Sequence, residues 1–387
     1  MTIHDEINKI YQKELSRQKL TVELIASENF ASKAVMKLCG SEFTNKYAEG
    51  YPGARYYNGC DFMDEIETMA IEQLKELYNC EFANVQPHSG ANANLAVFKA
   101  FLNPGDTILG MDLASGGHLT HGAPVTISGK WFNAHTYGVD EWGMIDYDEV
   151  AGLAQQHKPD MIIAGASAYP RQINWVKFRA IADSVGAMLL VDMAHYSGLI
   201  AGGAYDSPIE YADVVTSTTH KTLRGPRGGI ILWNNPEYTR KINSAVFPGT
   251  QGGPLMNIIA AKAQAFVEAN TKEFKDYSKN IVENAKELAK VIHNAKTLEV
   301  LTGGTDSHIV LVSLVKSELS GREAADILEK HRITVNKNGI PNDPRNFKET
   351  SGIRIGTAAE TTRGMTKKDF EKLGHRIVNI LEDESQW

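Results

Sequence analysis

Apolar residues recur along the chain with two spacings, one typical of helices and one typical of strands. Between residues 61 and 78 they fall three and four positions apart, which predicts a helix over 61–78 with Asp61 capping its start. The stripe of this helix consists of Phe62, Ile66, Met69, Ala70, Leu74 and Leu77. The N-terminus lacks the apolar region of a signal peptide, and an amphipathic helix is predicted there from Ile3, Ile7, Ile10 and Leu15.

Short apolar runs bounded by turn residues predict a series of strands. They cover residues 82–86, 107–111, 160–167, 187–192 and 214–219. An alanine-rich helix follows the first strand and ends at Leu102, and another helix spans about residues 176–185. Because strands that alternate with helices usually pair in parallel, we expect an α/β domain with a mostly parallel sheet.

The pattern changes toward the C-terminal part of the chain. A helical stretch over 256–295 is followed by a strand at 308–314, a helix at 321–332 and a short strand at 353–355. No repeat or low-complexity linker interrupts it. We therefore predict two domains: residues 1–270, with a helical arm and the large domain, and residues 271–387, a smaller C-terminal α/β domain.

Composition narrows the class of function. The chain has 387 residues and a net charge of -7, without the basic excess that nucleic-acid binding favours. No apolar run approaches the roughly 18 residues that a membrane span requires. The three cysteines, Cys39, Cys60 and Cys80, lack the spacing of a metal site and are interpreted as reduced thiols. We expect a cytoplasmic enzyme that binds neither nucleic acid nor membrane and holds no metal.

The predicted strand at 214–219 ends in His220 and Lys221, before a loop rich in glycine and arginine. In α/β folds, ligands bind in the crevice outside the carboxyl ends of the strands. Lysine forms a stable imine with an aldehyde, so its position suggests a covalent site for pyridoxal phosphate. The alternative is a solvated lysine in a loop, which is the commoner situation for an arbitrary lysine.

Two further features favour the cofactor site. Asp192 ends the strand at 187–192 and would face the same crevice, where a carboxylate keeps the pyridine nitrogen of pyridoxal phosphate protonated. Ser89 and Gly90 lie where the strand at 82–86 turns into a helix, a geometry that presents backbone N–H groups to a phosphate. The alternatives are that Asp192 is a helix cap and that residues 89–90 begin an ordinary capped helix.

The segment 214–229, Val-Val-Thr-Ser-Thr-Thr-His-Lys-Thr-Leu-Arg-Gly-Pro-Arg-Gly-Gly, resembles the cofactor-lysine signature of serine hydroxymethyltransferases. Other blocks resemble that family in the same order, so the resemblance covers nearly the whole chain. These blocks are residues 24–29, 44–53, 55–57, 83–90, 116–122, 243–249, 251–254 and 351–357.

The resemblance implies a fold-type I transferase that interconverts L-serine plus tetrahydrofolate with glycine plus 5,10-methylenetetrahydrofolate. It implies that Lys221 holds pyridoxal phosphate covalently, that Asp192 contacts the pyridine nitrogen and that His118 stacks on the ring. His195 would lie near O3' of the cofactor. The other cofactor residues that it implies are Tyr47, Ser89, Gly90, Ala91, Ser167, Arg227, Gly252 and Gly253, and Thr218 and His220 would support the Lys221 loop.

The resemblance also implies the amino-acid and folate sites. Arg354 would bind the substrate carboxylate through its planar guanidinium fork, assisted by Ser27. Glu49 would move the proton of the serine hydroxyl, close to Tyr56 and Tyr57. Leu113, Gly117, Leu119 and Asn338 would form the pterin pocket. In the family Tyr47, Glu49, Tyr57 and the Gly252–Gly253 loop come from the neighbouring subunit, so a homodimer with shared active sites is implied.

Three features depart from the family pattern. Ala91 stands where many members have a second serine, so one phosphate-binding hydroxyl is missing. Asn346, Phe347 and Lys348 replace Ser-Pro-Phe near the expected folate site. The chain ends at Trp387, about one helix earlier than typical members.

Two other functions remain as alternatives. One is a folate-independent aldolase or transaldolase of the same fold that cleaves β-hydroxy amino acids, which the block at 116–122 and the presence of Glu49 and Tyr57 disfavour. The other is a scaffold or RNA-binding relative that has lost catalysis, which the absence of a basic stripe disfavours.

Overall fold

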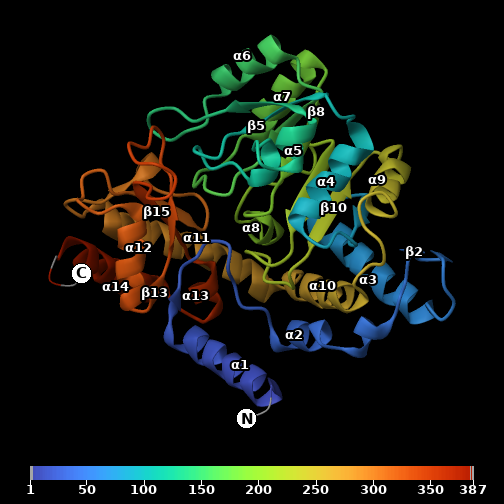
Figure 1. The fold of residues 1–387 in the computed structure, drawn as a ribbon, viewed down its shortest axis with the longest axis horizontal. Helices are drawn as coiled ribbons and strands as arrows, with labels where there is room; N and C mark the ends of the chain where they lie inside the picture. The colour runs from blue at the N-terminus through green and yellow to red at the C-terminus, as the bar shows by residue number, and fades with distance from the viewer. Residues whose placement is uncertain (1–2, 384, 386–387) are drawn as a thin grey trace.

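A computed structural model describes residues 3–383 and 385 (Figure 1). Its larger part is a seven-stranded sheet whose helices lie on both faces. The strands in spatial order are β4 (Phe82–Asn84), β10 (Gly229–Trp233), β9 (Val214–Thr218), β8 (Met188–Asp192), β7 (Met161–Ala164), β5 (Thr107–Met111) and β6 (Asn133–Tyr137). β10 runs antiparallel to β4 and β9, and every other pair is parallel, so the predicted mostly parallel α/β sheet is confirmed.

Alternation along the strands builds the two layers of core. Ile108, Ile163 and Leu190 face the layer that contains α4 (Gly90–Phe101) and α9 (Tyr238–Val246). Their neighbours Leu109, Ile162 and Leu189 face the opposite layer. The helices that contribute to this opposite layer include α3 (Asp61–Tyr78), α6 (Tyr147–His157), α7 (Trp175–Val185), α10 (Met256–Ala269) and the first half of α11 (Lys272–His293).

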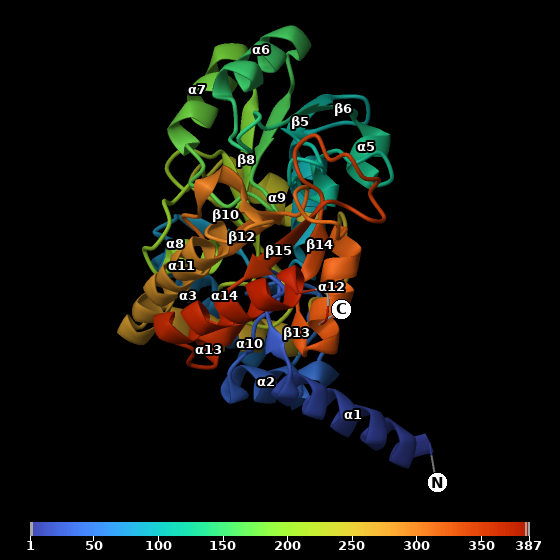
Figure 2. The same ribbon diagram turned by 90° about the vertical axis from the view of Figure 1, so that its left-hand side faces the viewer.

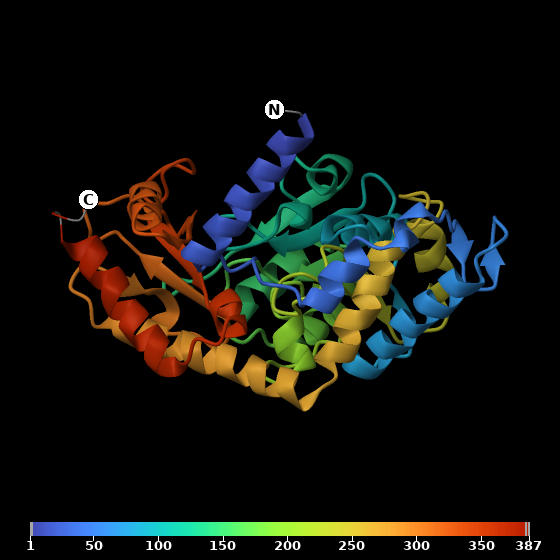
Figure 3. The same ribbon diagram turned by 90° about the horizontal axis from the view of Figure 1, so that it is seen from below.

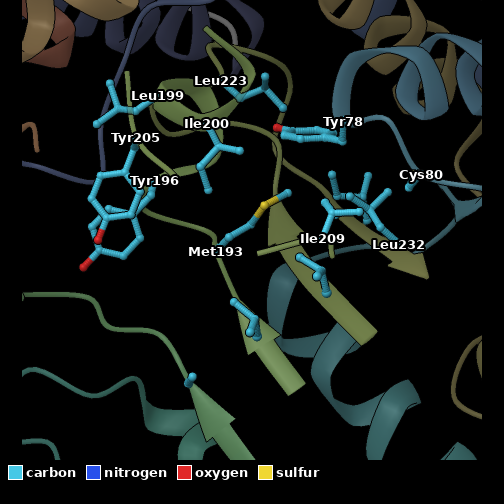
Figure 4. Close-up of a cluster of buried hydrophobic side chains, with 14 of the residues drawn as sticks. Tyr78, Cys80, Met193, Tyr196, Leu199, Ile200, Tyr205, Ile209, Leu223 and Leu232 are labelled. Carbon is cyan, nitrogen blue, oxygen red and sulfur yellow. The ribbon is translucent and has the colours of Figure 1, made fainter. Parts of the chain in front are cut away.

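The opposite layer supports the segments that follow β8 and β9. Tyr196 stacks on Tyr205 with ring centroids 4.6 Å apart and donates a hydrogen bond to the Tyr169 carbonyl. Figure 4 shows these two rings beside Leu199, with Leu223 and Met193 in the same cluster. Since these side chains are buried, the chain just after each strand end is held rigidly.

A second, four-stranded antiparallel sheet forms the rest of the C-terminal part. Its order is β11 (Glu299–Val300), β12 (Ile309–Ser313), β15 (Gly352–Gly356) and β14 (Asn336–Asn338). It packs on α12 (Gly321–Lys330), α14 (Lys367–Glu382) and the second half of α11 (Figure 2). Figure 3 shows α11, in orange, running along the lower edge of the view from the smaller sheet to the middle of the molecule, and its two halves pack in the two cores.

The N-terminal segment joins the two parts. α1 (Ile3–Leu20) buries no side chain within the chain, and it leads into β1 (Val22–Glu23), which pairs in parallel with β13 (Ile333–Thr334). Leu24 is buried in the core of the smaller sheet. The predicted division at residue 270 falls between α10 and α11, and it stays a prediction. The two predicted domains also include residues outside the described part of the chain, namely 1–2, 384 and 386–387, Trp387 among them.

The shorter elements complete the chain. They are α2 (Lys33–Cys39), β2 (Gly50–Tyr51), β3 (Ala54–Arg55), α5 (Ile127–Trp131), α8 (Ser197–Ala201), α13 (Ala358–Thr362) and the 3₁₀ turns at Glu42–Asn45, Leu119–His121 and Leu301–Gly303. Within the described residues, none of the helices has both the length and the apolar character of a membrane span.

Several predicted details differ from the structure. Asp61 is the first residue of α3 and does not cap it, because Cys60 occupies the N-cap without a side-chain hydrogen bond. Phe62 and Met69 are exposed within one chain, since α3 turns Met63, Ala70 and Leu74 to the core instead. The stretch 256–295 is two helices rather than one, and they are separated at residues 270–271.

Candidate active site

A cavity of about 190 Å³ opens at the carboxyl ends of β7, β8 and β9, beside the start of α4. Several candidate cofactor residues were predicted to lie at these strand ends, and the folded chain brings most of the candidate cofactor residues together there. The lining residues are Ser89, Gly90, Ala91, His118, His121, Ala166, Ser167, Asp192, Ala194, His195, Thr218, His220, Lys221 and Arg227. His121 was not predicted, although it lies three residues after His118 in one of the family blocks.

Lys221 is buried and its amine points to a hydroxyl rather than to a carboxylate. Nζ donates a hydrogen bond to Thr218 Oγ1 at 3.2 Å. Lys221 forms no ion pair with any carboxylate of residues 3–383 and 385. Burial lowers the pKa of Lys221 to about 8, while the charge of Asp192 acts in the opposite direction. A lysine with a lowered pKa has a larger share of the neutral amine, which is the form that attacks an aldehyde.

Asp192 is buried at the end of β8 and is held in a fixed orientation. Its Oδ2 accepts a hydrogen bond from Asn94 Nδ2 at 2.9 Å and forms another with His121 Nε2 at 3.1 Å. Its Oδ1 accepts one from the backbone of Ala194 at 3.1 Å. Burial opposes ionisation, but the bonds from His121 and Asn94 outweigh it and hold the pKa of Asp192 well below its usual value. The cavity therefore has a permanent negative charge on one wall.

His118 and His220 are neutral imidazoles on the cavity wall. Burial lowers the pKa of His118 to about 4 and that of His220 to about 3. His118 Nδ1 accepts a hydrogen bond from the backbone of Thr120 at 3.2 Å, which fixes the ring plane. A flat, uncharged ring at this position suits stacking on another aromatic ring.

His195 is oriented by a second buried histidine, His308 at the start of β12. His195 Nδ1 lies 3.4 Å from His308 Nε2, which also lies 3.2 Å from the Ala26 carbonyl. A carbonyl only accepts, so His308 Nε2 carries the proton and His195 Nδ1 is the acceptor. Burial holds the pKa of His195 well below its usual value, so the ring is neutral and its proton lies on Nε2. His195 thus offers an N–H donor rather than a lone pair at the edge away from His308.

The turn before α4 brings bare backbone to the cavity. Ser89 caps α4 by accepting a hydrogen bond from Asn92 N, and Gly90 is the first helical residue. A Cβ on Gly90 would lie 2.7 Å from Thr218 Cγ2, and one on Gly229 would lie 2.2 Å from the Ser89 carbonyl. Glycine is therefore required at both positions, and the free N–H groups at the start of α4 can receive an anion.

Arg354, on β15 of the smaller sheet, reaches toward the same cavity wall. Its Nη1 donates to the Ser167 carbonyl at 2.5 Å and its Nε donates to Asn336 Oδ1 at 3.1 Å. Burial lowers the pKa of Arg354 to about 10, and none of the carboxylates in the described part of the chain pairs with it. Nη2 is left without a partner there, so one edge of the guanidinium is available to a ligand carboxylate.

Comparison with known proteins agrees with this geometry. A sequence model of the serine hydroxymethyltransferase family matches residues 1–377. A serine hydroxymethyltransferase of Wolbachia pipientis subsp. Culex pipiens (strain wPip) is 59% identical over 379 residues, which are 97% of this chain and 89% of the relative. Serine hydroxymethyltransferase 2 of Rhodospirillum rubrum is 58% identical over 378 residues, which are 97% and 88% of the two chains. That of Cupriavidus pinatubonensis is 58% identical over 371 residues, 96% and 87% of the two chains.

The chain belongs to the serine hydroxymethyltransferase family. It is therefore a fold-type I transferase that depends on pyridoxal phosphate, uses tetrahydrofolate as cosubstrate and acts on serine and glycine. The family is homodimeric or tetrameric.

The residues present fit the cofactor of the serine hydroxymethyltransferase family. The cavity holds an unpaired buried lysine, a fixed carboxylate and an anion-binding helix start, which are the groups that pyridoxal phosphate requires for its aldehyde, its pyridine nitrogen and its phosphate. Ring nitrogen Nδ1 of His220, a lining residue, is buried without a hydrogen-bond partner among the described residues.

A group of three ligand atoms could also hold a metal ion. The ring nitrogens of His118 and His121 and a carboxylate oxygen of Asp192 all lie within 4.8 Å of one another. These residues wall the cavity in which the family holds its cofactor, and Asp192 already accepts a hydrogen bond from Asn94. We therefore assign this group to the cofactor cavity and keep the prediction of a site without metal.

A second set of candidate residues lies together but outside the cavity. Tyr57 donates a hydrogen bond to Glu49 Oε2 at 2.9 Å, and the rings of Tyr47 and Tyr57 meet edge to face with centroids 5.6 Å apart. A Cβ on Gly253 would lie 2.9 Å from the Tyr47 ring, and one on Gly252 would lie 3.5 Å from Glu49 Oε1. We call Tyr47, Glu49, Tyr57, Gly252 and Gly253 the hairpin cluster.

The hairpin cluster is open to solvent within one chain. Tyr47 is 60% exposed and Tyr57 is 44% exposed, and the cavity lining includes no member of the cluster. Tyr56 is also exposed and packs its ring edge against Phe247. Within one chain, therefore, the cavity with Lys221 and the hairpin cluster with Glu49 are separate.

The remaining candidates lie at the edges of the cavity. Ser27 is half-buried and follows Ala26, whose carbonyl contacts His308, and Arg227 is exposed on the cavity rim. Gly117 is buried against the backbone of Met111 and Asp112. Leu119 is half exposed on its 3₁₀ turn, while Leu113 is partly buried in the loop after β5.

Asn338 ends β14 beside the loop that follows β5. It lines a narrow gap with Ser115 and Gly116, while a wider cavity of about 440 Å³ next to it is lined by Asp112, Gly339 and Phe347. Asn338 and the segment 113–119 thus come from the two sheets to one place, although the cofactor cavity lining includes neither Asn338 nor Leu119.

Proposed function

We propose that this chain interconverts L-serine plus tetrahydrofolate with glycine plus 5,10-methylenetetrahydrofolate, with the chemistry centred on Lys221. The observation that carries the proposal is a buried lysine without an ion-pair partner, in one cavity with a fixed buried carboxylate, at the strand ends of an α/β sheet. When bound, pyridoxal phosphate supplies an aldehyde for the amino group and a ring that accepts electrons from the α-carbon.

The large-domain residues would hold and tune the cofactor. Lys221 would bond it covalently, and Thr218 accepts the hydrogen bond that positions the amine between cycles. Asp192, kept ionised by His121 and Asn94, would keep the pyridine nitrogen protonated. His118 would stack on the ring.

Residues at the cavity edge would complete the grip on the cofactor. His195 would donate its Nε2 proton toward O3'. Ser167 would contact the ring substituents, and Ser89, Gly90 and Ala91 would receive the phosphate at the start of α4. Arg227 and His220 would support the Lys221 loop, and the Gly252–Gly253 loop and Tyr47 would reach the cofactor of the neighbouring subunit.

Arg354 would hold the amino-acid substrate by its carboxylate, with Ser27 assisting. The available Nη2 edge of Arg354 and its fixed Nη1 and Nε bonds give the guanidinium one orientation before substrate binds. A clamp of this kind sets which bond to the α-carbon stands perpendicular to the cofactor ring, and this orientation selects the bond that breaks.

Glu49 would accept the proton of the serine hydroxyl as the side-chain carbon leaves, and return it in the reverse direction. Tyr57 donates a hydrogen bond to Glu49 Oε2, which fixes the carboxylate, and Tyr56 would line the same pocket. Because Tyr56 and Tyr57 are exposed and Glu49 is only partly buried in one chain, the proposal places these groups at the cavity of the neighbouring subunit.

The folate would lie where the two sheets meet. Leu113, Gly117 and Leu119 would contact the pterin and Asn338 would hydrogen-bond its edge. The wider cavity beside Asn338 is lined by Phe347, one of the residues that depart from the family pattern, so this face can alter folate affinity. We also propose that the enzyme works in the cytoplasm.

The test is the requirement for folate. Purified protein with pyridoxal phosphate and L-serine is expected to form glycine at a rate that rises with tetrahydrofolate and to form 5,10-methylenetetrahydrofolate in equal amount. A folate-independent aldolase would cleave L-allo-threonine and ignore tetrahydrofolate when given serine. Glycine formation from serine that is unchanged by tetrahydrofolate would refute the proposal.

A further inference from the structure

A fully buried lysine that none of the proposed steps uses lies behind the turn before α4. Lys262, in the middle of α10, is 1% exposed. Its Nζ donates hydrogen bonds to three backbone carbonyls, Val85 at 2.6 Å, Gly229 at 2.8 Å and Pro87 at 3.1 Å. No carboxylate of residues 3–383 or 385 forms an ion pair with it. Burying an ammonium group is costly, so a fold that retains one gains something in return.

The three carbonyls belong to two backbone segments, residues 85–90 and 228–229, which we call the cup because they meet beside the proposed phosphate site. Val85 and Pro87 lie between β4 and Ser89, and Gly229 begins β10 after the Lys221 loop. The Gly229 N–H also donates to the Pro87 carbonyl at 3.0 Å, so the two segments touch directly where Nζ binds both. Lys262 therefore fixes the distance between the two sides of the cup.

The surroundings of Lys262 are tightly packed. A Cβ on Gly228 would lie 2.5 Å from Lys262 Cε, so the loop passes directly over the lysine stem. An ammonium offers three N–H donors, which match three carbonyl acceptors without a lone pair facing any of them. Burial lowers the pKa of Lys262 to about 7, whereas the charge of Glu67 and the three carbonyl acceptors on Nζ favour the protonated form.

The cup is otherwise poor in cationic groups. Its first helical turn contributes Gly90 and Ala91, with no hydroxyl at residue 91, and Arg227 is exposed at the rim. A cation behind the backbone acts through a protein interior of low dielectric, so its field at the cup is weakly screened. The carbonyl bonds also orient the peptide groups of the turn.

We propose that Lys262 is a positioning residue for the phosphate of the cofactor, which it serves by fixing the two cup segments and placing a positive charge behind them. This rests on the proposed function, because it takes the turn before α4 as the phosphate site. Lys262 does not touch the reacting atoms, so its loss should change how the phosphate is held and leave the binding of the ring unchanged.

The experiment compares pyridoxal 5'-phosphate with pyridoxal, which has the same ring and aldehyde but no phosphate. Dissociation constants of both are measured by absorption titration of apo wild type, Lys262→Met and Lys99→Met. Lys99 is an exposed lysine of α4, so its variant makes the same change of charge on the helix that carries the cup. We expect Lys262→Met to weaken pyridoxal 5'-phosphate at least tenfold and to change pyridoxal less than twofold, and Lys99→Met to change neither.

Two results would overturn the inference. One is an equal loss for the two ligands, which would mean that Lys262 supports the whole cavity. The other is an unchanged affinity for pyridoxal 5'-phosphate. If Lys262→Met does not fold, as judged by thermal unfolding of the apo protein, Lys262→Gln decides instead, since its amide keeps two N–H donors without the charge and should show a smaller loss confined to the phosphate ligand. Wild-type protein that binds neither ligand would refute the proposed function rather than this inference.

Discussion

At the scale of single residues, the site contains two cations without carboxylate partners, the buried Lys221 and the partly buried Arg354. Burial lowers the pKa of each, to about 8 and about 10, because the charged form is poorly solvated. Buried charges are normally paired, so these two side chains are held ready for groups that arrive with a ligand. For Lys221 that group is an aldehyde, and for Arg354 it is a carboxylate.

Arg354→Lys should separate substrate binding from cofactor binding. An ammonium is a point donor and cannot form the two parallel hydrogen bonds of a guanidinium, so the loss for serine should be about 2 kcal/mol or more. Steady-state kinetics should show KM for serine raised at least tenfold, while the titration with pyridoxal phosphate is unchanged. A KM equal to that of wild type would exclude Arg354 as the carboxylate clamp.

Sequence patterns identified the residues at strand ends but not the residues behind them. Asp192, His195 and Lys221 could be placed because each follows a short apolar run, and the ends of parallel strands meet at one edge of the sheet. His308 and Lys262 carried no such signal. Their burial depends on which distant segments pack together, and neither residue's neighbours in sequence indicate it.

At the scale of elements, α3 was predictable from the helical spacing of its apolar residues, and the buried parallel strands β5, β7, β8 and β9 from short apolar runs bounded by turn residues. β6 was not predicted, since its polar residues Asn133, His135 and Thr136 carry no alternating apolar signal at the sheet edge. β10 was also missed as a separate strand. It closes the sheet antiparallel between β4 and β9, and it brings Gly229 against the start of α4.

The start of α4 gives a prediction about the missing hydroxyl. Ala91 lines the cavity in the first turn of the helix, where an added side-chain oxygen should reach a phosphate oxygen. Ala91→Ser should therefore tighten pyridoxal phosphate about tenfold, or ~1.4 kcal/mol, with little change in turnover at saturating cofactor. Equal dissociation constants in titrations of the two apo proteins would show that residue 91 does not hold the phosphate.

At the scale of the whole molecule, one chain contains both the cavity with Lys221 and the hairpin cluster with Glu49 but does not join them. The cavity with Lys221 is lined by residues from the strand ends and the start of α4, whereas the hairpin cluster, in which Tyr47 and Tyr57 are exposed, is absent from this lining. In the homodimer of the family, the hairpin cluster of each subunit is expected to complete the cavity of the other. The resemblance to the family implied this separation, but no pattern of residues indicates it by itself, because it depends on where the hairpin folds within its own chain.

Mixed dimers test the sharing of active sites. Lys221→Gln and Glu49→Gln homodimers should each lose most folate-dependent serine cleavage. Heterodimers of the two, co-expressed with different tags and purified on both, should recover about half of the wild-type activity, because one of the two sites again contains Lys221 and Glu49. If both residues act within one chain, the heterodimers will be as inactive as the homodimers.

The central claim is that Lys221 is the covalent cofactor residue. Purified protein loaded with pyridoxal phosphate should show a visible absorption band that sodium borohydride removes, and the reduction should leave the cofactor permanently attached. Peptide mapping by mass spectrometry should then find the pyridoxyl mass on Lys221 in the segment 214–229. The same mass on Lys262 or on any other lysine, with Lys221 unmodified, would contradict the account.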